Sequence, residues 1–423
     1  MDGARRGMPL LRTRLFVMML LEFFIWGAWL PLIFGYLPAL GFSSLQQSLI
    51  LNAFPVAAIV GMFFSNQFAD RNFAGERFLA FSHLVGGLAM LGLGFTRSFW
   101  PFFALMTVHC LFYVPTISIT NSIAFASLKD AQKEFGLVRM GGTIGWILAA
   151  WPIYFIFQGL NPEQVVDATR WTYVVAGAAS LALAIFSLSL PHTPPRKAGE
   201  AGAGKLAWLE AMKLLRHPFV LVLWIITFVD SFVHTCYFSW TGRFLASPVV
   251  GLEGKWIMPV MSISQVSEIL TMAVLGLVLK KLGWRATMTL GILGHAARFA
   301  VYAFAPSPAL VVGVQVLHGI CYAFFFATVY IFVDAFFPKD ARSSAQGLFN
   351  VMILGIGQLV ANFLCPVLFD EVFTKNGVTD WRSMFIMPTL IALGAAVALA
   401  VFFRPPRTQE AGASVPEAQP SGA

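Results

Sequence analysis

The sequence predicts an all-α membrane protein with twelve transmembrane helices in two six-helix halves, and three observations support this fold class. The 423 residues are 58% hydrophobic and only 11% charged, whereas soluble domains average about 25% charged residues. Apolar segments long enough to cross a bilayer as helices recur along the whole chain. The basic residues gather at alternate ends of these segments, which is typical of multi-pass membrane proteins.

Each apolar segment is expected to form a helix, because only helices and closed barrels satisfy every backbone hydrogen bond in lipid. The twelve expected spans are, in order, 15–37, 46–66, 78–96, 99–124, 137–158, 171–191, 218–240, 256–279, 286–304, 308–333, 343–369 and 381–403. The first span follows Arg5 and Arg6, as a signal peptide would, but it is longer than the apolar core of a signal peptide. We therefore interpret it as the first helix.

The distribution of charge predicts the orientation in the membrane. Of the 28 Lys and Arg residues, twenty lie at the span ends on the side of both termini and six lie at the opposite ends. Basic residues favour the cytoplasmic side, so we expect cytoplasmic termini and a location in the cytoplasmic membrane. The net charge of +8 then reflects topology, and we expect no nucleic-acid partner.

Composition also divides the chain into parts. We expect an N-terminal six-helix half (1–191), a cytoplasmic central loop (192–217), a C-terminal six-helix half (218–403) and a disordered tail (404–423) that is too polar to fold.

The central loop contains "GEAGAGK", which matches the spacing of a phosphate-binding loop. Leu206 follows its lysine where that loop needs a hydroxyl, and no strand precedes the glycines. The chain also has no HExxH or GxSxG pattern, and its four cysteines fall inside predicted spans without metal-ligand spacing. We therefore expect no cofactor, no metal site and no enzymatic activity.

Polar residues inside the spans point to a shared cavity. An ionisable group in a transmembrane helix costs roughly 2.5 to 3.5 kcal/mol on insertion scales, so each one calls for a reason. Several of these groups recur at helical spacing with an aromatic, hydroxyl or amide neighbour on the same face. They are Glu22, Trp26 and Trp29; Arg139, Thr143 and Trp146; Asp230, His234 and Tyr237; and Gln265 with Glu268.

A simpler explanation applies to each residue taken alone. A tryptophan at helical spacing is often a packing residue or an interfacial anchor, and a buried carboxyl can serve only to hold helices together. His295 and Arg298 are interpreted as structural, because we expect the ninth helix to pack outside the cavity. His83, His109 and His318 are interpreted as packing residues.

The turn between the second and third spans, "NQFADRNFAGER", indicates a family of folds. A short basic turn recurs after the eighth span as "KKLGWRATM". Two six-helix halves with such a turn after the second helix of each resemble the major facilitator superfamily. The resemblance implies that Asp70 and Arg71 belong to its conformational loop motif.

Six segments resemble a narrower family, the nucleoside:proton symporters, which include the nucleoside and xanthosine permeases. These segments are "EFFIWGAWLP", "YVPTISITNSIAFA", "VRMGGTIGWI", "SISQVSEIL", "SSAQGLFN" and "NGVTDW". They follow the family's order from the first helix to the last. The resemblance implies that five positions serve substrate or proton, namely Arg139, Thr143, Trp146, Gln265 and Glu268.

One residue departs from the family pattern. The family carries an aspartate in the tenth helix within a motif like YDFxxxxxY, but this chain reads "CYAFFFATVY" with Ala323 at that position. Asp230 with His234 in the seventh helix also differs from the amide-rich version of that helix in the permeases. Either the acid has moved to Asp230, or the substrate and coupling differ.

The expected function is proton-coupled uptake of nucleosides by alternating access, in a monomer surrounded by lipid. Expected substrate-binding residues are Trp26, Arg139, Thr143, Trp146, His234, Tyr237, Gln265 and Glu268, and expected proton carriers are Glu268 first, then Glu22 and Asp230. Two alternatives stay open. One is a related transporter of a sugar or organic cation, and the other is a membrane sensor that binds a ligand without transporting it.

Overall fold

The structure is a computed structural model that describes residues 10–61, 72–195, 212–337 and 342–405, and nearly all of them are helical. The first part of the chain forms α2 (Leu11–Ala39), α3 (Ser44–Leu51), α4 (Ala53–Val60), α6 (Gly75–Leu93), α7 (Phe99–Ser127), α8 (Ala131–Ile156), α9 (Pro162–Ala168) and α10 (Arg170–Ser187). The second part begins with the short 3-10 helix η2 (Leu214–Arg216), α12 (Pro218–Ala246) and α13 (Gly254–Phe304).

Two of the later membrane-length helical stretches, which we call rods, each consist of consecutive α-helical and short 3-10 or π-helical segments. One rod consists of α14 (Pro308–Gly313), η3 (Val314–Val316), α15 (Leu317–Cys321), η4 (Tyr322–Ala327) and α16 (Thr328–Phe336). The next consists of α17 (Arg342–Asn350), η5 (Val351–Ile356), α18 (Gly357–Val367) and η6 (Leu368–Phe373). The strands β1 (Thr374–Lys375) and β2 (Val378–Thr379) lead into α19 (Trp381–Phe402).

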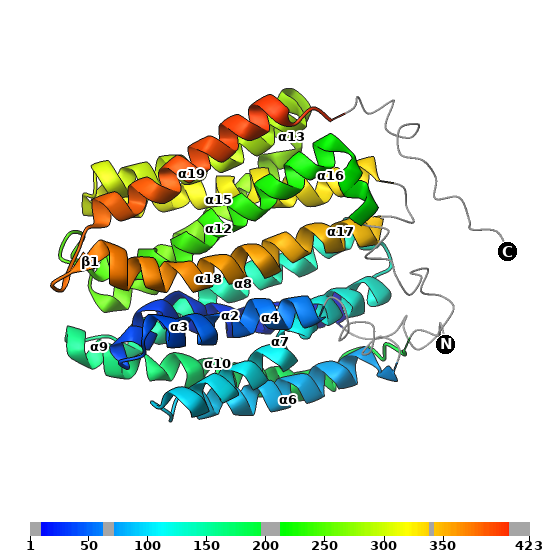
Figure 1. Cartoon of the computed structure of the whole chain (residues 1–423). Helices are drawn as coiled ribbons and strands as arrows, with labels where there is room; N and C mark the ends of the chain where they lie inside the picture. The colour runs from blue at the N-terminus through cyan, green and yellow to red at the C-terminus, as the bar shows by residue number, and fades with distance from the viewer. Residues whose placement is uncertain (1–9, 62–71, 196–211, 338–341, 406–423) are drawn as a thin grey trace.

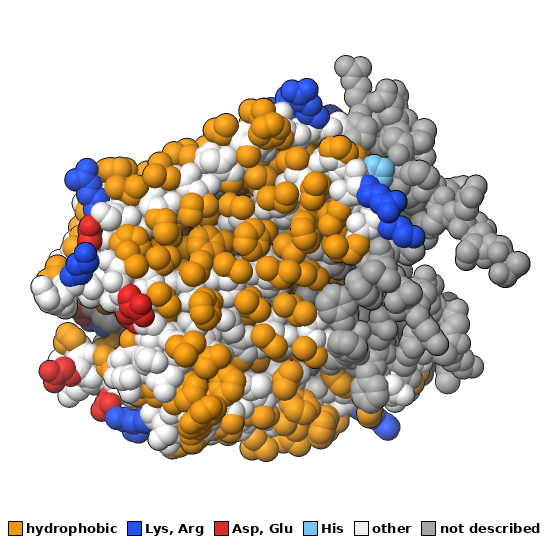
Figure 2. Space-filling view, in the orientation of Figure 1, with side chains coloured by type: hydrophobic (Ala, Val, Ile, Leu, Met, Phe, Trp, Pro, Cys, Tyr) orange, Lys and Arg blue, Asp and Glu red, His pale blue; other side chains and the backbone are white. Residues whose placement is uncertain are grey.

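Eight stretches of the described helices are long and apolar enough to cross a bilayer. Figure 2 shows a broad hydrophobic band between two ends that carry the charged side chains. The prediction of an all-helical membrane protein is thus confirmed. The count of twelve crossings stays a prediction.

We call α2 to α10 the first group of helices and α12 to α19 the second group, and Figure 1 shows most of the first group below the second. Their interiors form two large hydrophobic clusters, whose buried members run from Leu15 to Leu190 in one and from Val220 to Phe403 in the other. The beginning of α2 and the end of α19 lie at the same end of the molecule in Figure 1.

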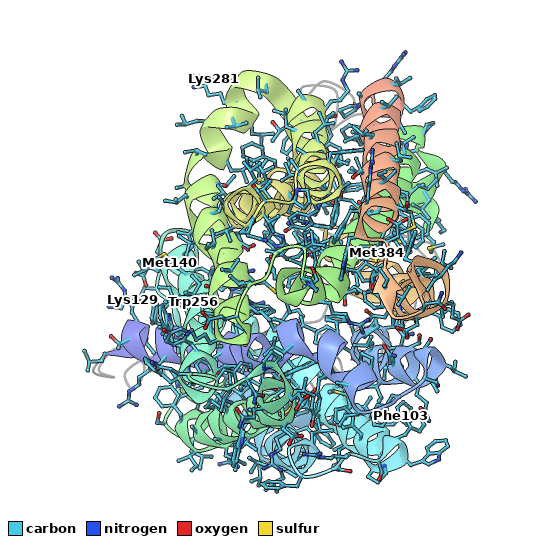
Figure 3. The ribbon with its side chains drawn as sticks, turned by 90° about the vertical axis from the view of Figure 1, so that its left-hand side faces the viewer. Phe103, Lys129, Met140, Trp256, Lys281 and Met384 are labelled. Atoms are coloured by element: carbon cyan, nitrogen blue, oxygen red, sulfur yellow. The ribbon has the colours of Figure 1, made fainter. Side chains whose placement is uncertain are left out.

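The eighth and ninth expected spans form one assigned helix, α13, with a sharp bend. Gly283 sits at that bend with a φ of 74° and a ψ of 174°, which are not helical values. A positive φ is easy only for glycine, since it has no Cβ. The bend falls inside the basic turn expected from the sequence, and Figure 3 shows α13 folding back on itself near Lys281.

The segment "NGVTDW" forms the turn that precedes α19. Asn376 and Gly377 both have positive φ, 52° and 76°, and an Asn-Gly pair of this kind closes a two-residue hairpin. The hairpin pairs Thr374 with Thr379. Asp380 then caps α19 by accepting a hydrogen bond from the backbone amide of Ser383.

Several expectations fall on residues that the structure does not describe. Asp70 and Arg71 lie outside the described residues, as do most of the expected central loop and all but the first residues of the expected tail.

Gly145 lets α8 and α2 pack backbone to backbone. A Cβ at this position would collide with the main-chain carbonyl of Leu20 on α2, and small residues at such crossings are typical of membrane helices. We expect Gly145→Val to destabilise the protein by more than about 3 kcal/mol, because the main chain of α2 cannot move aside as a flexible side chain can. Thermal unfolding in detergent measures the effect.

Gly136, on the same helix, has open space around the position of its missing Cβ. Gly136→Ala is therefore the control, and its melting temperature should stay close to that of the unchanged protein. Equal melting temperatures for both variants would contradict the close packing of α2 on α8.

Candidate functional site

A row of aromatic rings crosses from one group of helices to the other. Trp26 on α2 stacks on Phe54 of α4 at a centroid distance of 4.7 Å, and it meets Trp146 of α8 edge-on at 5.3 Å. Trp146 in turn meets Phe238 of α12 at 6.3 Å. Trp26, Trp146 and Phe238 are all half-buried. The structure therefore brings together two of the predicted aromatic residues at the boundary between the groups.

Arg139 and Glu268 face the same region from opposite groups. The Arg139 guanidinium lies 4.1 Å from the centre of the Phe23 ring, and its charge acts on Glu268 of α13 and on Tyr322 of η4. Glu268 is half-buried, and so is Thr143, which lies one turn beyond Arg139 on α8. A guanidinium and a hydroxyl on α8, and a carboxylate on α13, which packs against α8, are thus all partly exposed.

Close helix packing holds Glu268 in place. A Cβ at Gly319 of α15 would collide with the backbone of Ser267 and Glu268, so these two helices approach as closely as only glycine allows. The Ser267 hydroxyl also donates to the Val316 carbonyl at 2.5 Å. The backbone that carries Glu268 is therefore anchored to the next rod.

Three predicted site residues carry buried polar atoms that have no hydrogen-bond partner among the described residues. They are the indole Nε1 of Trp26, Nδ1 of His234 and Oε1 of Gln265. An unsatisfied buried polar group costs about 1–3 kcal/mol, so each one calls for an explanation such as a ligand or water. An indole donor and an imidazole at the aromatic row, with an amide acceptor on α13, suit a flat, polar solute.

Glu22 lies apart from this region, although it is one turn from Trp26. Its carboxylate lies 2.8 Å from His83 Nε2 and accepts from the Thr116 hydroxyl at 2.8 Å, and the Tyr113 hydroxyl donates to its main-chain carbonyl at 2.7 Å. His83, on α6, also lies 3.0 Å from Ser180 Oγ of α10. These contacts join Glu22 to its own group of helices.

Asp230 and Tyr237 lie on the same helix as His234 but are buried inside the second group of helices. Tyr237 is fully buried, and its hydroxyl bonds to Ser264 at 2.8 Å and to Gln315 Oε1 at 2.9 Å. Asp230 is also fully buried, and His295 Nε2 lies 3.8 Å from its Oδ2. His234, by contrast, is half-buried and contacts the Phe238 ring at 5.4 Å.

The sequence analysis interpreted His295 and Arg298 as structural and His318 as a packing residue. The structure places Arg298 against the face of Tyr237 at 4.0 Å, with its guanidinium donating to Nδ1 of both His318 (2.7 Å) and His295 (2.9 Å). The signal was present, because a charged residue preceded one turn earlier by a histidine is costly in a transmembrane helix.

A polar network joins the two groups at the end of the molecule that lies opposite the beginning of α2. Arg243 of α12 donates to the Phe34 carbonyl of α2, and its guanidinium stacks on Phe369 at 4.2 Å. Asp370 of η6 accepts from Ser44 at 3.1 Å and from Gln47 at 3.0 Å. These bonds hold the two groups together there, and the sequence analysis did not anticipate them.

Comparison with known proteins identifies the family. The model of a family described as nucleoside H+ symporter matches residues 10–408. The chain belongs to the nucleoside H+ symporter family. It is 31% identical over 405 residues to YegT of Escherichia coli K12, covering 93% of each chain. The xanthosine permease of the same organism is 28% identical, with 92% of this chain and 94% of the permease covered.

Solved structures share the fold. A crystal structure of the nucleoside transporter NupG, in an aspartate-to-alanine variant, superposes with a TM-score of 0.83 at 24% identity over 93% of this chain and all of that one. A D-xylose–proton symporter superposes with a TM-score of 0.69 at 14% identity, covering 95% of this chain and 99% of that one. This symporter-family chain thus has the fold of the major facilitator transporters, and its relatives are transporters, not enzymes.

Proposed function

We propose that this chain carries nucleosides together with protons across the cytoplasmic membrane. The observation that carries the proposal is that Trp26 and His234, at the aromatic row, and Gln265 on α13 have buried polar atoms without a hydrogen-bond partner among the described residues. Family membership supports it, since the family is described by nucleoside–proton symport. An apolar pocket with a few unpaired polar groups is the usual form of a small-molecule site.

Each predicted binding residue has a role in this proposal. The base stacks against Trp26 or Trp146, and such stacking contributes about 1–3 kcal/mol per base in nucleic-acid systems. The ribose hydroxyls bond to Gln265, Glu268 and Arg139. Thr143 and His234 complete the polar lining from α8 and α12, whereas Tyr237 is buried and holds Ser264 and Gln315 behind it.

Glu268 is the first candidate for the proton carrier. Loading a proton turns a carboxylate into a neutral group that is less costly to hold in low-dielectric surroundings. Arg139 provides the opposing charge that favours release of this proton, and the two residues come from different groups of helices. Glu22 and Asp230 are the alternative carriers.

The proposed architecture has twelve crossings in two six-helix halves, residues 1–191 and 218–403, that rock about the central site. The two separate hydrophobic clusters support this division. The termini are proposed to be cytoplasmic, which agrees with the excess of basic residues on that side and with the common end at which α2 begins and α19 ends. We propose a monomer as the working unit.

A competition assay tests the substrate class. We expect unlabelled uridine, or another nucleoside, to reduce uptake of labelled nucleoside into proteoliposomes far more than glucose does at equal concentration. The reason is that glucose has hydroxyls for Gln265 and Glu268 but no flat base for the tryptophans. Equal or stronger inhibition by glucose would favour the sugar-transporter alternative.

A further inference from the structure

Asp230 is a buried carboxylate without direct hydrogen-bond donors. It is 0% exposed on α12, and neither side-chain oxygen has a hydrogen-bond partner among the described residues. His295 Nε2 lies 3.8 Å from Oδ2, which is beyond a direct hydrogen bond. A carboxylate held this way has two oxygens free to take a proton.

Arg298 fixes the hydrogen atoms of the two neighbouring histidines. A guanidinium only donates hydrogen bonds, so Nδ1 of His295 and Nδ1 of His318 must both accept. Each imidazole is then neutral and carries its single proton on Nε2. The Nε2–H of His295 is therefore on the nitrogen that lies 3.8 Å from Asp230 Oδ2, and the positive charge of Arg298 acts on Asp230 through space.

The surroundings of Asp230 contain several more titratable groups. From the elements packed around it, these are His234 and Tyr237 on α12, His295, Arg298 and Tyr302 on α13, and His318 and Cys321 on α15. Tyr302 is tied to Gln315 at 2.7 Å, and Tyr237 is tied to Ser264 and Gln315. Among these histidines, His234 alone is half-buried rather than buried.

His234 connects the buried cluster with the aromatic row. Its ring lies 4.9 Å from His318 and 5.6 Å from His295 between centroids, and 5.4 Å from Phe238 on the other side. Its Nδ1 has no partner among the described residues, and it stands one helical turn from Asp230. Of these two residues, only the imidazole is partly exposed, while the carboxylate is buried.

We propose that Asp230 is a second proton-binding site, reached through His234 and positioned by His295 and Arg298, so that two protons accompany each nucleoside. His234 gains one proton and gives up one, so it is neutral before and after the transfer, and an O–H bond forms on Asp230. Glu268 and Asp230 are then two carboxylates, each able to load one proton and each under the charge of a separate guanidinium, Arg139 and Arg298 respectively. This inference rests on the proposed function, and Asp230 supplies a carboxylate in a chain that has Ala323 in its tenth helix.

The test is the steady-state accumulation of labelled uridine in proteoliposomes as a function of an imposed pH difference, with the membrane potential clamped at zero. Each coupled proton multiplies the accumulation ratio by about ten per pH unit. We expect about a hundredfold per unit for the unchanged protein and about tenfold for Asp230→Asn. Asp167→Asn is the matched control, since that exposed carboxylate on α9 forms an ion pair with the exposed Arg97, and it should keep the steeper dependence.

His234→Gln distinguishes the proposed proton path through His234 from the proton-binding site at Asp230. It should slow pH-driven uptake while leaving the accumulation ratio unchanged, because a slower path does not alter the number of protons bound. A tenfold dependence in the unchanged protein would overturn the proposal even if Asp230→Asn fails to fold, as would a hundredfold dependence in Asp230→Asn. Uridine accumulation that ignores pH altogether would instead contradict the proposed proton coupling itself.

Discussion

Glu268→Gln should lower pH-driven accumulation of nucleoside by about tenfold per pH unit, while exchange of labelled for unlabelled nucleoside persists. Glutamine keeps the shape and the hydrogen-bonding capacity of the side chain but cannot load and release a proton. The remaining accumulation would depend on Asp230, so the double variant Glu268→Gln/Asp230→Asn should exchange nucleoside without accumulating it. Exchange is the essential second measurement, since it shows that the variants still fold, bind and change conformation.

Glu22 provides the comparison for this experiment. It is a carboxylate in a transmembrane helix, but it is satisfied by His83 and Thr116 within its own group of helices. Glu22→Gln should therefore change the affinity or rate without changing the dependence on pH difference. Full pH-driven accumulation in Glu268→Gln would remove Glu268 from the proton coupling.

A disulfide between residues 44 and 370 should stop transport completely. Ser44 Oγ and Asp370 Oδ2 are 3.1 Å apart across the two groups of helices, so cysteines at both positions can pair with little movement of the backbone. Alternating access requires this end to open. We expect oxidation of Ser44→Cys/Asp370→Cys to abolish nucleoside uptake and a reducing agent to restore it.

The two single-cysteine variants are the controls, because each removes one polar partner without allowing the bridge. The four native cysteines are buried and should not react. Undiminished uptake by protein shown to be fully cross-linked would mean that this end does not open during transport. The polar network of Arg243 and Asp370 would then not control access to the site.

The fold was largely readable from the sequence, because apolar length alone defines a membrane helix. Described helical segments cover most of each expected span, although α8 begins at Ala131 rather than 137, α12 ends at Ala246 rather than 240, and α9 was not expected. Gly283 bends α13 inside the expected turn. The turn "NGVTDW" also adopts the geometry that its Asn-Gly pair favours. What the sequence could not supply is which face of each helix meets which neighbour.

Glu22 illustrates this limit. Its spacing from Trp26 placed both on one face, yet Glu22 contacts α6 and α7 while Trp26 contacts α4 and α8. A central helix such as α2 is surrounded by neighbours, so residues only one turn apart meet different partners. Trp26 and Trp146 do meet, as their spacing suggested.

Long-range contacts were beyond sequence reasoning. Ser44 and Asp370 are separated by 326 positions, and no local pattern relates them. Arg298 was assigned to packing on the assumption that the ninth helix lies outside the cavity. In the structure its side chain contacts His318 and Tyr237. Arg298 therefore lies at the centre of a buried polar cluster.

The most direct test of proton-coupled nucleoside transport is internal pH in proteoliposomes that enclose a pH-sensitive dye. Adding uridine outside, with no initial pH difference and the membrane potential clamped at zero, should acidify the interior as nucleoside and protons enter together. Glucose should cause no such change, and Glu268→Gln/Asp230→Asn should take up uridine without acidification. Uridine entry at the normal rate with no acidification in the unchanged protein would contradict the account.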